Sequence, residues 1–111
     1  VAGKPDTLYI FRQRLDSLCL GLRTHYPKAR IGFVTPWDVP EEGFKEVNAL
    51  IHEICKGYEI PVYNAATQSG IIVADSAFRK QYFQGPRDQA HLNNAGHDLM
   101  VEKGETFIRS L

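Results

Sequence analysis

The sequence lacks the features that mark several classes of protein. Its 13 basic and 13 acidic residues balance without a basic run, so nothing favours nucleic acid or an anionic membrane surface as a partner. No apolar run approaches the ~20 residues that cross a bilayer, and no secretory signal is visible. The two cysteines, Cys19 and Cys55, lie in apolar helical patterns outside any C-x-x-C pair. They read as two buried thiols, with a disulfide between two core helices as the alternative.

What is present is typical of one globular domain over residues 1–111, in which 43% of residues are hydrophobic. Apolar residues at steps of three and four predict a helix from Thr7 to the turn before Pro27, and another over about 41–56. Gly57 is placed to end the second helix in a left-handed cap. The stripe of the first helix consists of Leu8, Phe11, Leu15, Leu18 and Leu22.

Two short apolar runs, 31–34 and 60–64, are typical of buried strands. Helix, strand, helix, strand is an order that predicts an α/β fold with a parallel, right-handed crossover. Trp37 follows the first run, at the edge where ligands bind in open α/β sheets, and either lines a cleft or covers the loop base. Residues 65–90 then form a long connection, with a short helix predicted over 76–83.

The candidate catalytic residues are Asp88 and His91, in the segment Asp88-Gln89-Ala90-His91. A carboxylate three residues before an imidazole can fix its tautomer and stabilise the imidazolium, which is the orienting half of a catalytic triad. His91 would then serve as general base for a serine. After it, Asn93 or Asn94 is expected to cap the last helix.

Two other interpretations of this segment stay open. Asp88, His91, His97 and Asp98 are close in sequence and are hard-to-borderline metal ligands. His97, however, falls in the first helical turns and is expected to point away from His91. In the second interpretation the chain is a non-catalytic α/β binding module, and the Asp88–His91 contact only fixes a loop.

The segment Asp88-Gln89-Ala90-His91-Leu92-Asn93-Asn94-Ala95-Gly96 resembles the last conserved block of the SGNH hydrolases, also called GDSL esterases and lipases. That block is commonly D-x-x-H-L-N followed by a small residue and glycine. Upstream, His25-Tyr26-Pro27-Lys28-Ala29-Arg30-Ile31, Val34-Thr35-Pro36 and Ile60-Pro61-Val62-Tyr63-Asn64 are also similar to the family, so the resemblance covers essentially the whole chain. It implies a serine esterase or lipase that needs no cofactor or metal, with Asp88 and His91 as acid and base of the triad.

The resemblance also implies that half of the enzyme is elsewhere. The G-D-S nucleophile block and the G-x-N-D block of the oxyanion hole are absent from these residues, and Asp75-Ser76 is preceded by Ala74 and lies on the wrong side of the sequence. The expected fold is therefore a partial flavodoxin-like, three-layer α/β/α arrangement that contributes the last two parallel strands of an SGNH-type sheet. An incomplete domain of this kind should be inactive alone and should pack against its missing N-terminal half or another copy.

For the intact enzyme, the resemblance implies a small-molecule ester as substrate, either an acyl ester or an acetylated carbohydrate. Trp37, Tyr82 and Phe83 are candidate substrate-binding residues, because aromatic rings suit an apolar or sugar-stacking rim.

Overall fold

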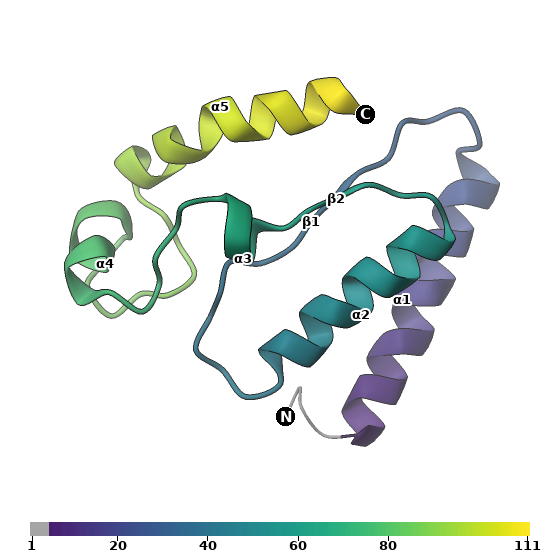
Figure 1. Ribbon diagram of the computed structural model, residues 1–111, viewed down its shortest axis with the longest axis horizontal. Coiled ribbons are helices and arrows are strands. Elements are labelled where there is room, and N and C mark those ends of the chain that lie inside the picture. Colours follow the sequence, from purple (N-terminus) through teal and green to yellow (C-terminus); the bar gives the residue numbers. More distant parts are fainter. Residues whose placement is uncertain (1–4) are drawn as a thin grey trace. The chain divides into compact units, whose positions relative to one another are not determined.

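A computed structural model describes residues 5–111, which fall into two compact units (Figure 1). The first unit comprises the chain to Thr35 together with Glu41–Val62, and the second comprises Pro36–Pro40 and Tyr63–Leu111. The elements are α1 (Pro5–His25), β1 (Phe33–Val34), α2 (Phe44–Gly57), β2 (Val62–Tyr63), α3 (Ala65–Gln68), α4 (Ser76–Tyr82) and α5 (Asn94–Ser110).

In the first unit α1 and α2 lie side by side and bury a common core (Figure 1). Its buried residues are Leu15, Cys19, Ile54, Cys55 and Ile60. The predicted helices are confirmed, but the stripe on α1 runs through Cys19, whereas Leu18 is 52% exposed. Burying a side chain such as Leu15 contributes roughly 1.5–3 kcal/mol, so this seam is the main source of stability in the unit.

The end of α2 is tied to α1 by side chains. The Arg23 guanidinium donates to the carbonyl oxygens of Tyr58 at 3.0 Å and Glu59 at 2.8 Å. The Tyr58 hydroxyl donates to the Asp16 carboxylate at 2.8 Å, and this bond raises the pKa of the phenol. The left-handed backbone position predicted at Gly57 falls instead on Glu59, whose φ is 56°. Gly57 remains the last residue of the helix.

The predicted flavodoxin-like three-layer arrangement is wrong. The five helices of the described residues have 21, 14, 4, 7 and 17 residues, whereas β1 and β2 have 2 each. Ile31 and Ile60, expected in strands, pack as irregular backbone against the α1–α2 core. Pro61 has no N–H to extend the pairing, and its carbonyl accepts from the Phe33 N–H at 2.9 Å. α1 and α2 pack against each other, and Phe33 of β1 and Val62 of β2 pack against their common core.

The second unit has its own core, which consists of Ile71, Val73, Phe83 and Leu92. The short predicted helix is confirmed as α4, capped by the Asp75 carboxylate, which accepts from the Ala77 N–H at 2.9 Å. The Arg79 guanidinium crosses the loops and donates to the carbonyls of Val73 and Pro86. α4 and α5 pack together, so the segment between them is held at both ends.

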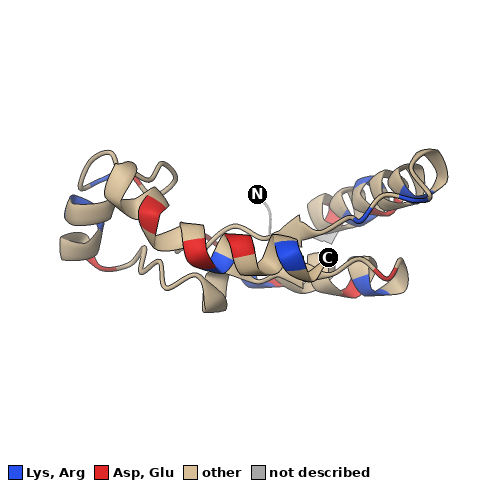
Figure 2. Ribbon diagram, turned by 90° about the horizontal axis from the view of Figure 1, so that it is seen from above, with Lys and Arg blue, Asp and Glu red and all other residues tan. Residues whose placement is uncertain are grey.

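Basic and acidic residues are interspersed along the helices (Figure 2). The only ion pair between α1 and α2 in the described part of the chain joins Arg12 to Glu53, and both are exposed. Pairs of this kind contribute about 0–1 kcal/mol, so packing holds the helices together. None of the helices within residues 5–111 combines the length and apolar character needed to span a bilayer.

The two cysteines are buried free thiols that hydrogen-bond to each other across the α1–α2 seam, so the first interpretation of them is confirmed. Burial is the main reason why the pKa of Cys19 is raised and that of Cys55 is raised to about 12. Only the thiolate reacts with disulfide reagents.

We therefore expect an aromatic disulfide reagent at pH 8 to modify Cys19 and Cys55 at least roughly a thousandfold more slowly in the folded chain than in urea. Absorbance of the released thiolate measures the rate. The control is Ser17→Cys, exposed on the same helix, in a chain whose native cysteines are alanine. Equal rates for the native thiols and this control would contradict the assigned burial.

Candidate functional site

Asp88 and His91 meet in a turn between α4 and α5, as the sequence predicts. The His91 Nδ1 lies 3.1 Å from Oδ2 and 3.2 Å from Oδ1 of Asp88. The His91 side chain is 75% exposed, against 24% for Asp88. With the Nδ1–H donated to the carboxylate, Nε2 keeps its lone pair and is left to accept a proton.

The Asp88 carboxylate is itself fixed by the backbone. Its Oδ1 accepts from the N–H groups of Ala90 and His91, both at 2.8 Å. These two bonds are the largest causes that lower the pKa of Asp88, ahead of its contact with the imidazole. The carboxylate therefore stays charged and oriented whether or not His91 is protonated.

A ladder of backbone bonds holds this turn against the end of α4. Phe83 and Leu92 form an antiparallel bridge, and the Gln84 N–H donates to the His91 carbonyl at 2.8 Å. The Gln84 side-chain amide donates to the Leu92 carbonyl at 2.9 Å. Leu92 is 3% exposed, so the residue after His91 anchors the turn in the core while the imidazole faces outward.

Asn93 joins the turn to both helices. Its side-chain amide donates to the carbonyls of Gln81 at 2.8 Å and Phe83 at 3.0 Å, and its Oδ1 accepts from the Gly96 N–H at 2.9 Å. The first two bonds satisfy acceptors at the end of α4, and the third caps α5. The predicted cap is thereby assigned to Asn93.

Gly96 allows α5 to approach α4. A Cβ at this position would lie 2.2 Å from the carbonyl oxygen of Tyr82 and 2.9 Å from the side chain of Leu92. Neither neighbour can move easily, because the first is backbone and the second is buried. In contrast, a Cβ at Gly104, later in α5, would meet nothing within 4 Å.

Of the three aromatic residues predicted to bind substrate, Phe83 lies in the core of this unit, and Trp37 and Tyr82 pack against that core. Phe83 is 2% exposed, and the ring of Trp37 packs edge-on against it with centroids 6.1 Å apart. The Trp37 indole N–H donates to the Gln89 carbonyl at 3.0 Å. The ring of Tyr82 packs against that of Phe78, with the two ring centroids 4.5 Å apart. Trp37 and Tyr82 keep partial exposure, whereas Phe83 presents almost no surface to a ligand.

No serine hydroxyl among residues 5–111 is hydrogen-bonded to His91, whose ring bonds are those to Asp88. The Ser69 hydroxyl is buried and donates to the Ala65 carbonyl, while Ser110 donates to Phe107. Ser76 is the first residue of α4. Within residues 5–111, the site thus has an oriented imidazole with no serine hydroxyl bonded to it.

A metal centre would require His97 and Asp98 to join Asp88 and His91. Within the described part of the chain, no group of three or more histidine, cysteine, aspartate or glutamate side chains is arranged to hold a metal ion.

Searches against protein families and curated proteins return no match for this chain. Its fold is nevertheless found in solved structures. A protein from Lactobacillus plantarum, determined by structural genomics, has a TM-score of 0.78 at 23% identity, over 90% of this chain and 53% of that one. A second crystal structure has a TM-score of 0.79 at 20% identity, over 91% and 52%. The chain thus spans about half the length of both, and the likeness shows the fold alone.

The sequence predicts the Asp88–His91 contact and offers Asn93 as one of two caps, but it does not predict the bonds of Asn93 to the end of α4 or the close approach at Gly96. Both residues belong to the motif, in which Asn93 is the polar residue and Gly96 is the glycine that follows the small residue. The hydrogen bond from Trp37 to Gln89 joins residues 52 positions apart, so no local sequence pattern indicates it.

The cause of the lowered Asp88 pKa can be tested by replacing its weaker partner. In His91→Ala the backbone N–H groups of residues 90 and 91 remain, so the Asp88 pKa should stay below its ordinary ~3.9. The carboxyl carbon resonance, followed by NMR from pH 7 to 2, gives this pKa. Because the folded-state value lies below the unfolded one, the stabilisation is present above pH ~3.9 and is lost as pH falls through the folded pKa. Return of the pKa to ~3.9 in His91→Ala would show that the imidazole is the main cause.

The close approach at Gly96 predicts opposite effects for two glycines of one helix. Gly96→Ala should lower the free energy of unfolding by about 1–3 kcal/mol, because the new methyl group overlaps Tyr82 and Leu92. Gly104→Ala has open space and should raise it by about 0.4–1 kcal/mol. Urea unfolding followed by circular dichroism measures both. Similar effects of the two substitutions would rule out the packing assigned to Gly96.

Proposed function

We propose that this chain carries the acid–base half of a serine ester hydrolase, with His91 as general base and Asp88 as the residue that orients it. One observation carries the proposal. The imidazole is held at Nδ1 by a carboxylate that two backbone N–H groups fix, while its other nitrogen projects from an exposed ring. A contact that only fixed the turn would not need the imidazole, since the Asp88 bonds to the backbone already do so.

The chemistry follows from this arrangement. A serine Oγ attacks the ester carbonyl carbon while the His91 Nε2 takes its proton, and Asp88 stabilises the imidazolium. The imidazolium then returns the proton to the departing alcohol, and the acyl group remains on the serine. Water, deprotonated by His91, attacks the acyl-enzyme and releases the carboxylic acid and the free serine.

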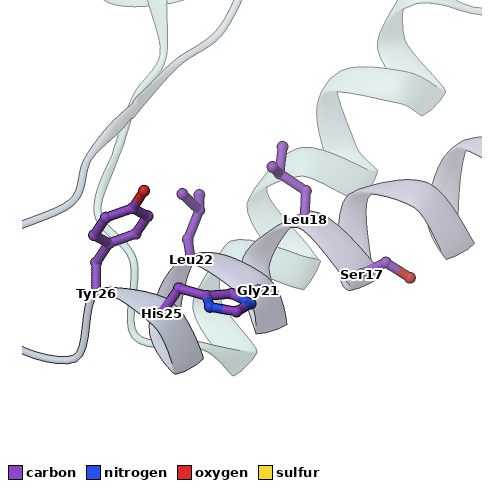
Figure 3. A pocket seen from close by; sticks show the side chains of 6 residues that line it. All are labelled: Ser17, Leu18, Gly21, Leu22, His25 and Tyr26. Carbon is purple, nitrogen blue, oxygen red and sulfur yellow. The ribbon is translucent and has the colours of Figure 1, made fainter.

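The serine and the oxyanion donors are proposed to come from a polypeptide segment beyond these residues. The half-length coverage of both solved structures supports this. Exposed apolar side chains support it as well, because a covering segment would remove them from water. In the first unit the exposed side chains of Leu18 and Tyr26 and the half-buried Leu22 project from one side of the chain, beside Gly21 (Figure 3). In the second unit Val101 and Ile108 are 59% and 67% exposed.

The substrate class proposed is a carboxylic ester of a small molecule, either an acyl ester or an acetylated carbohydrate. A short activated ester such as p-nitrophenyl acetate is a suitable first probe, because it needs little of the binding surface. A fluorophosphonate probe reports the activated serine directly.

In the protein that unites this chain with its serine-bearing segment, His91→Ala should lower kcat for p-nitrophenyl acetate by at least about 10³-fold and abolish fluorophosphonate labelling, because the serine loses its base. Asp88→Asn should lower kcat by up to about 10⁴-fold, because the His91 imidazole would then adopt the wrong tautomer. The matched control is His97→Ala, which removes an exposed imidazole six positions away on α5.

His97→Ala should retain activity. Retention of most activity by His91→Ala would refute the assigned base. Absence of labelling in the unsubstituted protein would favour the non-catalytic binding module.

A further inference from the structure

One peptide group in the turn, that between Gln89 and Ala90, is held from both sides. Its carbonyl oxygen accepts from the Trp37 indole N–H at 3.0 Å, and its N–H donates to Oδ1 of Asp88 at 2.8 Å. A peptide group is planar and rigid, so rotation about its flanking bonds moves both atoms together. Loss of the hydrogen bond from the Trp37 indole would therefore let this peptide group rotate. Its N–H would then no longer hold the Asp88 carboxylate in one orientation.

Trp37 is itself anchored. Its ring meets Phe83 at 85°, edge to face, and such pairs are favourable beyond the area they bury. Phe83 is fixed in turn by burial and by its bridge to Leu92, the residue after His91. A backbone bond of 2.7 Å from the Val39 N–H to the Trp37 carbonyl tightens the loop that carries the indole. The indole N–H thus donates from a rigid support.

We propose that Trp37 is a positioning residue for His91. It acts through the Gln89–Ala90 peptide group on the Asp88 carboxylate, and through the carboxylate on the tautomer and orientation of the imidazole. The importance of this for catalysis rests on the proposed function, whereas the effect on the imidazole is a property of the chain itself. In this role Trp37 contributes without touching substrate.

The test replaces the indole N–H and little else. Incorporation of benzothienylalanine at position 37 keeps the shape of the bicyclic ring and puts sulfur in place of the N–H. Trp37→Phe removes the donor with a natural residue that retains a ring for Phe83. Phe78→Leu is the control, because it disturbs the same core through the Tyr82 contact without touching the turn. Nitrogen-15 NMR of the His91 ring reports its tautomer, and urea unfolding reports global stability.

Both replacements of Trp37 should give a mixture of the two His91 tautomers, whereas the native chain should show the Nδ1–H tautomer alone. Hydrogen exchange at the amides of Ala90 and His91 should become roughly two- to tenfold faster, as expected for the loss of one net hydrogen bond. Phe78→Leu should lower the unfolding midpoint and leave the ring signals unchanged. Unchanged His91 signals in the benzothienylalanine chain would overturn the proposal, since that chain keeps its packing.

Failure of the proposed function gives a different result. In that case the protein united with its serine-bearing segment shows no fluorophosphonate labelling, while the His91 tautomer still depends on Trp37. If labelling occurs and the tautomer does not depend on Trp37, the function stands and the positioning role fails.

Discussion

The carboxylate of Asp88 is the group on which the candidate site depends. It accepts from two backbone N–H groups and from one imidazole nitrogen within a turn of four residues. A carboxylate held in this way needs neither a buried cation nor a deep cavity to stay charged, because backbone donors lower its pKa. The imidazole can therefore remain at the surface and still have a defined tautomer.

The rest of the second unit turns this local arrangement into a fixed one. Phe83 and Leu92, the two residues of the bridge, are buried, and Gly96 lets α5 come within contact of the last carbonyl of α4. The site is thus built on a small core with short connections, and all its braces come from that one unit. This explains how an imidazole can be held in a fixed orientation in a chain with so little sheet.

The sequence predicts local features of this molecule well and long-range ones poorly. Apolar periodicity gave α1 and α2, Asn93 was one of two expected caps, and spacing alone paired Asp88 with His91. The prediction of a layered sheet was wrong, because an apolar run such as residues 31–34 can form either a strand or irregular backbone packed on helices. Phe83 was predicted to bind substrate but lies in the core. The sequence around an aromatic residue does not indicate whether its ring faces the core or a ligand.

The bonds of Asn93 have a consequence for how the second unit opens. A single side chain both starts α5 and occupies the carbonyls at the end of α4, so neither helix end can fray without releasing the other. Local unfolding of proteins proceeds in such cooperative blocks. The turn that carries His91 lies between these two ends and belongs to the same block. Order at the imidazole is therefore coupled to the integrity of the first turn of α5, and the His91 ring is either held in place or released together with the start of the helix.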